Sequence, residues 1–258
     1  MSTSNAHART GQALSAEEET EPHVSYAFQP IVDAQERCVI SYEALIRGRN
    51  GEPAGQVLSS VPDAHMYEFD TRSRMIAVAL AMRLGLPCDL NLNLMPRSLL
   101  EPEAAPIDRT LAAAEKCGLS ANRIVIEITE GELIHDHARF SKLINVYRAS
   151  GVKVAIDDFG AGYSGLNLLA EFQPDQLKID MALVRGIASN GPKQAIVRAI
   201  ASVCLDLGID LIAEGIETVE EFYWLTSEGL RYFQGYLFGK PGFATLPTPT
   251  YPTLTAPK

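Results

Sequence analysis

The sequence is poor in cysteine, and its few thiols are widely spaced. Cys38, Cys88, Cys117 and Cys204 form no CxxC pair. This pattern fits neither a zinc site nor a dense disulfide framework. Reduced, mostly buried thiols in a cytoplasmic protein are therefore expected.

Long hydrophobic runs are also missing. No apolar run approaches the roughly 20 residues that cross a bilayer, and residues 1–22 lack the apolar stretch of a signal peptide. We expect no association with a membrane. Residues 1–22, which carry a cluster of glutamates, are expected to be disordered. The proline-rich residues 245–258 are expected to be an extended or disordered tail.

Positive charge is scarce. The chain has 22 Lys and Arg residues against 32 Asp and Glu residues, a formal net charge of −10. General affinity for nucleic acid needs a basic surface that displaces counterions from phosphates, so DNA binding is not expected. A phosphate-containing substrate remains compatible with this charge if metal ions or a few placed cations supply the positive charge.

Between the two tails, short apolar runs alternate with segments of helical period. One such segment has apolar residues at 140, 143, 144 and 147, and another has Ile196, Ile200, Val203 and Leu207. Eight strands are expected at 27–32, 38–46, 89–94, 123–129, 153–157, 176–180, 210–214 and 233–238. This alternation predicts one α/β domain over 23–244, a closed (β/α)₈ barrel.

The first two expected strands are joined only by residues 33–37. That link is too short for a crossover helix, so this pair should be antiparallel and the barrel not strictly regular. The strand that carries Glu43 is expected to be the antiparallel one.

Polar residues lie near the carboxyl ends of nearly all these strands. They are Glu43, Asn93, Glu127, Asp157, Asp158, Lys178, Glu214 and Gln234. Each alone could be a helix cap or an inward amide, but the ends of parallel barrel strands meet on one face. Five carboxylates that close repel one another unless cations compensate. Oxygen ligands of this kind favour Mg²⁺ or Mn²⁺ over zinc.

Two other motifs offer alternatives to this metal site. Residues 160–165 satisfy GxGxxG after a strand, but Asp157 and Asp158 directly before the loop would repel a pyrophosphate. A flexible glycine loop beside the metal site is the preferred interpretation. The His135-Asp136-His137 triplet is interpreted as a solvated turn, and no histidine ends an expected strand, so no Ser-His-Asp arrangement is indicated.

Seven ordered motifs between residues 24 and 243 resemble the EAL domain family. They are YEALIR (42–47), NLMP (93–96), EITE (127–130), DDFGAGYS (157–164), KID (178–180), AEGIET (213–218) and QGY (234–236). The resemblance implies a modified TIM (β/α)₈ barrel with an antiparallel first strand. It also implies hydrolysis of cyclic di-GMP to linear pGpG.

The resemblance also implies roles for individual residues. Two Mg²⁺ or Mn²⁺ ions would be bound by Glu43, Asn93, Glu127, Asp157, Asp158 and Glu214, with Asp157 bridging them. Glu43, Lys178 and Glu214 would be the catalytic residues, and Lys178 would hold or polarise the attacking water. Arg47 would grip a substrate phosphate and Gln234 would orient groups near the metals. Glu130, Glu217 and Asp180 would support the ligands and the glycine loop.

Some positions depart from the family pattern. Met95 and Gly165 replace common serines, and residues 48–74 look like the EAL branch that is often fused to BLUF light sensors. Some members of that branch are non-catalytic receptors or antirepressor-like interaction modules, so this is the alternative function. The complete set of matched ligands favours an enzyme. A homodimer and a regulatory protein partner are further expectations from the resemblance.

Overall fold

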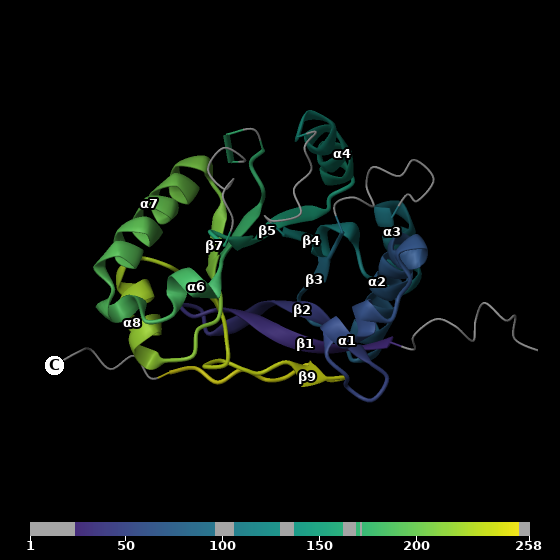
Figure 1. The fold of residues 1–258 in the computed structure, drawn as a ribbon, viewed down its shortest axis with the longest axis horizontal. Helices are drawn as coiled ribbons and strands as arrows, with labels where there is room; N and C mark the ends of the chain where they lie inside the picture. Colours follow the sequence, from purple (N-terminus) through teal and green to yellow (C-terminus); the bar gives the residue numbers. More distant parts are fainter. Residues whose placement is uncertain (1–23, 96–105, 130–136, 162–168, 171, 253–258) are drawn as a thin grey trace, which may run out of the picture.

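Eight strands close into a barrel, and a ninth short strand lies along the first (Figure 1). The computed structural model describes residues 24–95, 106–129, 137–161, 169–170 and 172–252. The strands are β1 (Val24–Asp33), β2 (Cys38–Gly48), β3 (Asp89–Asn93), β4 (Ile124–Thr129), β5 (Lys153–Phe159), β6 (Gln176–Ile179), β7 (Asp210–Ala213), β8 (Tyr232–Gln234) and β9 (Gly242–Phe243).

The barrel is parallel except at its first strand. β1 pairs antiparallel with both β2 and β8, whereas β2 to β8 run parallel to one another. The predicted barrel with an antiparallel first strand is therefore confirmed. The expectation that Glu43 lies on the antiparallel strand is wrong. The tight turn after Asp33 reverses the chain, so β2 already has the direction of the later strands.

Helices lie on the outside of the barrel, on both flanks and at the top of the view in Figure 1, whereas β9 lies along the bottom. In that view α2 and α3 lie on one side, α7 and α8 lie on the other, and α4 lies between them. The α-helices are α1 (Ala54–Ser59), α2 (Met66–Arg83), α3 (Pro106–Lys116), α4 (His137–Ala149), α6 (Met181–Val184), α7 (Gly191–Leu207) and α8 (Val219–Ser227). Short 3₁₀ turns lie at Asp63–His65, Ala121–Arg123 and Ile187–Ser189.

The strands are buried on both faces, and β4 illustrates why. Successive strand residues point to opposite faces. Ile124, Ile126 and Ile128 belong to the hydrophobic core between barrel and helices. Val125 and Glu127, buried on the other face, therefore point into the barrel. This alternation places a carboxylate inside an otherwise apolar strand.

The buried face of α7 is rotated from the predicted stripe. Val197, Ile200 and Cys204 are buried, whereas Ile196 is 47% and Leu207 42% exposed. The helix contains apolar residues on more than one face, so apolar period alone does not choose between neighbouring stripes.

Strand β8 ends sooner than predicted, at Gln234. A Cβ on Gly235 would lie 2.2 Å from the carbonyl oxygen of Ile216, so only glycine allows this backbone approach. Ile216 N–H donates to Gln234 O (3.1 Å) and Leu237 N–H donates to Ile216 O (3.0 Å). The chain after β8 therefore bonds to the loop after β7 instead of extending the barrel.

Residues 245–252 contain no helix or strand but lie against the outside of the barrel. Tyr42 Oη donates to Pro247 O (2.9 Å), and Thr250 N–H donates to Phe238 O (2.8 Å). The Tyr251 ring packs on Phe238 at 6.2 Å between centroids. This segment, yellow along one edge in Figure 1, covers strands that the short β1–β2 turn leaves without a helix.

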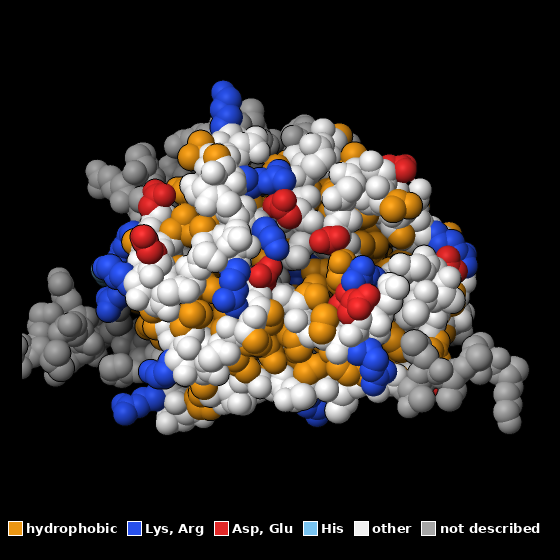
Figure 2. Space-filling model, turned by 180° about the vertical axis from the view of Figure 1, so that it is seen from behind, with side chains coloured by type: hydrophobic (Ala, Val, Ile, Leu, Met, Phe, Trp, Pro, Cys, Tyr) orange, Lys and Arg blue, Asp and Glu red, His pale blue; other side chains and the backbone are white. Residues whose placement is uncertain are grey.

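Acidic and basic side chains are interspersed on the face seen in Figure 2, and no single basic stripe forms among the described residues there. Within the described ranges, no helix has the length and apolarity that a membrane crossing requires.

Candidate metal centre and active site

The parallel strands bring the predicted polar residues to one end of the barrel, with Lys178 at the centre. The Lys178 side chain, on β6, is completely buried. Its Nζ lies 2.6 Å from Glu214 Oε1, 2.9 Å from Glu127 Oε1, 3.0 Å from Asp157 Oδ1 and 3.4 Å from Glu43 Oε2. The convergence predicted from the strand ends is thus found.

Lys178 is held in its charged form. Burial by itself lowers the pKa of an ammonium group. Here the neighbouring carboxylates, chiefly Asp157, Glu127 and Glu214, outweigh burial and raise the pKa of Lys178 well above its ordinary value.

One lysine does not balance the surrounding acids. Burial, together with the charges of Glu43 and Asp157, raises the pKa of Glu127 to about 8 despite the contact with Lys178. Burial and nearby acids also raise the pKa of Glu214 well above its ordinary value. The site therefore carries more carboxylates than its own cation can keep ionised.

Asp158 reaches the same site because β5 is irregular at this point. Successive residues of a regular strand point to opposite faces. The pairing of β5 with β6 shifts between Ile156 and Phe159, and Asp158 has a left-handed backbone with φ of 56°. Aspartate is one of the few residues besides glycine that occasionally adopt this conformation. Burial, Asp157 and Asp180 raise the pKa of Asp158 to about 6.

The oxygen atoms fit divalent cations. Glu43, Glu127 and Asp157 each offer an oxygen within 4.8 Å of the others, and so do Asp157, Asp158 and Glu214. Asp157 belongs to both groups. Glu127 Oε2 is buried without a hydrogen-bond partner, which is costly unless a cation or donor reaches it. A set of carboxylates and one amide is typical of Mg²⁺, Mn²⁺ or Ca²⁺ ligation.

Side-chain amides fix Glu43. Asn93 Nδ2 donates to Glu43 Oε1 (3.2 Å), and Gln234 Nε2 donates to Glu43 Oε2 (2.6 Å). Burial raises the pKa of Glu43, but Lys178, Gln234 and Asn93 outweigh burial and lower it. Both predicted amide positions thus lie at the site.

Two further amides were not predicted from the sequence. Asn91 Nδ2 donates to Glu127 Oε1 (2.8 Å). Gln29 accepts from Gln234 (3.3 Å) and lies opposite Glu43 in the β1–β2 register. The alternation of Asn91 with Asn93 along β3 places both on one face of the strand and could have revealed the first of them.

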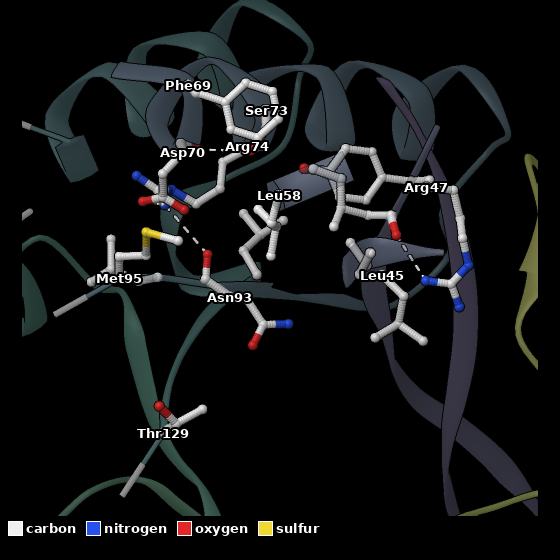
Figure 3. A pocket seen from close by; sticks show the side chains of 16 residues that line it. Leu45, Arg47, Leu58, Phe69, Asp70, Ser73, Arg74, Asn93, Met95 and Thr129 are labelled. Atoms are coloured by element: carbon white, nitrogen blue, oxygen red, sulfur yellow. Dashed lines mark hydrogen bonds and ion pairs between the residues drawn. The ribbon is translucent and has the colours of Figure 1, made fainter. Parts of the chain in front are cut away.

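Two cavities are lined by predicted site residues. One, of about 330 Å³, is lined by Glu43, Asp157, Asp158 and Glu214. The other, of about 250 Å³, has mostly apolar walls that include Leu45, Leu58 and Phe69, and it reaches Asn93 (Figure 3).

Arg47 lines the apolar cavity. Its Nη1 donates to Ile46 O (2.8 Å). Among the described residues it pairs with no carboxylate, so its remaining donors are available to an anionic ligand.

The predicted supporting residues lie at the rim. Asp180 caps α6 by accepting from Ala182 N–H (2.8 Å), and Glu217 forms an ion pair with Arg185. Both line the acidic cavity, and neither is one of the four carboxylates that form ion pairs with Lys178. Glu130, His135, Asp136 and residues 162–165 lie outside the described residues, so their predicted roles stay predictions.

Comparison with known proteins identifies the family. A family model described as the EAL domain matches residues 12–241. The chain belongs to the EAL domain family. The predicted membership is confirmed by a match that covers most of the sequence.

Named relatives of this EAL domain include an antirepressor and a probable enzyme. The chain is 37% identical over 229 residues to the blue light- and temperature-regulated antirepressor BluF of Escherichia coli, covering 88% of this chain and 56% of BluF. It is 31% identical over 234 residues to the probable cyclic di-GMP phosphodiesterase PdeN of the same species, covering 83% of this chain and 43% of PdeN. The chain thus spans about half the length of these relatives.

Solved structures share the fold of this EAL domain. A manganese and cyclic di-GMP complex of Klebsiella pneumoniae BlrP1 superposes with a TM-score of 0.83 at 41% identity, covering 90% of this chain and 58% of that chain. A calcium and cyclic di-GMP complex of the same protein gives a TM-score of 0.85.

Proposed function

We propose that this EAL domain is a metal-dependent phosphodiesterase that hydrolyses cyclic di-GMP to linear pGpG. One observation carries the proposal: five carboxylates and Asn93 lie together at one end of the barrel, and Lys178, which contacts four of these carboxylates, does not balance their charge. Similar proteins named as probable cyclic di-GMP phosphodiesterases support it.

The described residues offer oxygen atoms that could hold such ions. Glu43, Asn93, Glu127, Asp157, Asp158 and Glu214 would hold two Mg²⁺ or Mn²⁺ ions, with Asp157 shared between them. Ions bound there supply Lewis acidity and lower the pKa of a water molecule. Glu43 and Glu214 both contact Lys178, so metal binding and water positioning depend on the same side chains.

The remaining residues act on the substrate and the water. Lys178 would hold the attacking water and offset negative charge on the phosphoryl oxygens. Arg47, on the cavity wall, would bind a substrate phosphate. Gln234 keeps Glu43 oriented. Attack of the water forms a new P–O bond while the P–O3′ bond breaks, and the departing O3′ takes up a proton.

The experiment incubates the purified protein with cyclic di-GMP and Mn²⁺ or Mg²⁺ and follows pGpG by chromatography. Glu127→Gln keeps the side-chain volume but removes a ligand charge. Glu228→Gln is the matched control, because Glu228 pairs with Arg198 away from the site. We expect metal-dependent pGpG from the wild type and the control and none from Glu127→Gln. Absence of pGpG from metal-loaded wild type would contradict the proposal.

A second candidate role is that of an antirepressor-like interaction module, because BluF is similar over 88% of the chain. A protein that binds cyclic di-GMP without forming pGpG would favour this role or that of a receptor. The regulatory partner of such a module would be a protein whose binding changes with cyclic di-GMP.

We also propose a homodimer. Sedimentation at micromolar concentration tests it, and a fully active monomer would contradict a role of dimerisation in the reaction.

A further inference from the structure

Among the described residues, Arg74 is the largest fully buried side chain outside the acid cluster. It lies on α2 with 2% exposure. It forms an ion pair with Asp70 one turn earlier, and its Nη1 donates to the backbone oxygen of Asn93 (3.3 Å). Its other nitrogens lie 3.4 Å from the hydroxyls of Thr71 and Thr110. A buried guanidinium needs such partners, because desolvation of an unpaired charge is costly.

Asp70 and Arg74 hydrogen-bond to the backbone at the end of β3, at the residues directly before and after Leu94. Arg74 binds the carbonyl of Asn93, and Asp70 accepts a hydrogen bond from the backbone N–H of Met95. Leu94 N–H itself donates to Glu127 O (2.9 Å). The backbone that carries Asn93 is therefore fixed by α2 on one side and by β4 on the other.

The position of that backbone determines where the Asn93 side chain lies. The Asn93 amide donates to Glu43 at the acid cluster. Figure 3 shows Asp70, Arg74, Asn93 and Met95 together on one wall of the apolar cavity. Buried ion pairs add little net stability compared with apolar side chains of similar volume, so stability alone does not account for a charged pair at this place.

We propose that Asp70 and Arg74 are positioning residues that hold Asn93 as a metal ligand. The inference rests on the proposed function only for the identity of Asn93 as a ligand. Arg74 acts through its fork of donors, of which one binds Asp70 and Asn93 together. A lysine at this position keeps the charge but lacks the fork.

The test measures Mn²⁺ affinity of the metal-free protein by calorimetric titration, without substrate. Arg74→Lys is expected to weaken Mn²⁺ binding about 10-fold, as changes behind metal ligands commonly do. The same substitution in an Asn93→Ala background should change affinity by less than about 2-fold, because the coupled residue is absent. Asp70→Asn should behave like Arg74→Lys and covers the case in which Arg74→Lys does not fold.

A matched control is available on the same helices. Arg109 of α3 forms a two-pronged ion pair with Glu68 of α2, at 2.6 and 2.9 Å, away from β3. Arg109→Lys should leave Mn²⁺ affinity within about 2-fold of the wild type. Thermal unfolding of every variant separates lost stability from lost affinity.

Unchanged Mn²⁺ affinity in folded Arg74→Lys and Asp70→Asn would overturn the inference, as would an equal loss in the Asn93→Ala background. Wild-type protein that binds Mn²⁺ but forms no pGpG overturns the proposed function alone. Wild-type protein that binds no Mn²⁺ overturns both. A 10-fold loss of Mn²⁺ affinity that occurs when Asn93 is present, and not in the Asn93→Ala background, supports the positioning role.

Discussion

The two ends of the barrel differ in how their acidic side chains are paired with basic ones. At the amino-terminal ends of the parallel strands, acids have basic partners: Lys153 Nζ lies 2.8 Å from Asp89 Oδ2 and Arg148 Nη2 2.8 Å from Asp175 Oδ1. Asp33, at the end of the reversed strand β1, pairs with Arg231. At the carboxyl-terminal ends, one lysine contacts four carboxylates. Balanced charge serves the fold, and unbalanced charge indicates a site for cations.

The largest expected effect comes from removing the central cation. Lys178→Met keeps a side chain of similar length but removes the ammonium group that contacts the acids. We expect kcat for cyclic di-GMP hydrolysis to fall about 10²- to 10³-fold, as for loss of one transition-state donor. Steady-state kinetics at saturating Mn²⁺ measure this. Wild-type turnover by the variant would mean that Lys178 has no part in the reaction.

At the opposite end, Asp33→Asn should destabilise the fold. Asp33 accepts from the backbone N–H groups of Gln35 (2.9 Å) and Glu36 (3.0 Å) and pairs with Arg231. We expect the free energy of unfolding to fall by about 2 kcal/mol. This is less than for a fully buried ion pair, because Arg231 is half-exposed and solvent weakens the pair. Urea unfolding at pH 7 measures it, with the exposed Glu36→Gln as control.

The same acid predicts a pH dependence. Burial raises the pKa of Asp33, but Arg231 and the two backbone N–H groups outweigh burial and lower it. Because the folded-state pKa is lowered, ionised Asp33 stabilises the fold above the unfolded-state pKa of about 3.9. This stabilisation is lost as the pH falls through the folded-state pKa. The stability difference between wild type and Asp33→Asn should therefore shrink below about pH 4. A constant difference down to pH 2 would contradict this account of Asp33.

Neutralising an acid of the metal site should increase the free energy of unfolding, whereas Asp33→Asn should decrease it. Because its pKa is raised to about 8, Glu127 destabilises the metal-free fold near neutral pH. Glu127→Gln should therefore stabilise the metal-free protein by about 1 kcal/mol while it abolishes activity. Thermal unfolding in chelator tests this, and a lower melting temperature would show that the acids are already balanced.

The smallest effect is expected for Lys153→Gln. Lys153 is half-exposed in its pair with Asp89, and such pairs contribute about 0.5 kcal/mol or less. Urea unfolding should barely differ from wild type. A loss above about 2 kcal/mol would mean that the balanced end is also tightly coupled.

The sequence predicted the barrel and most of the acid cluster for one physical reason. A carboxylate or lysine near the end of an apolar strand, such as Glu127 in IVIEIT or Lys178 in QLKID, has few stable places except a shared polar centre.

Other features depend on contacts between distant segments. Asn91 and Gln29 look like ordinary strand residues until the register places them beside Glu127 and Glu43. From the sequence, Arg74 would be expected to be an exposed polar residue of a helix. Packing of α2 and α3 against β3 buries it. The direction of β2 and the buried face of α7 likewise depend on the closed barrel, which local patterns do not encode.

The central claim is that the acid cluster lacks positive charge until divalent cations bind. Calorimetric titration of the metal-free protein with MnCl₂ near pH 7, in two buffers of different ionisation enthalpy, tests it most directly. Because the pKa of Glu127 is raised to about 8, Mn²⁺ binding should release protons, and Glu127→Gln should weaken binding and reduce the release. Absence of Mn²⁺ binding, or binding without proton release, would contradict the account.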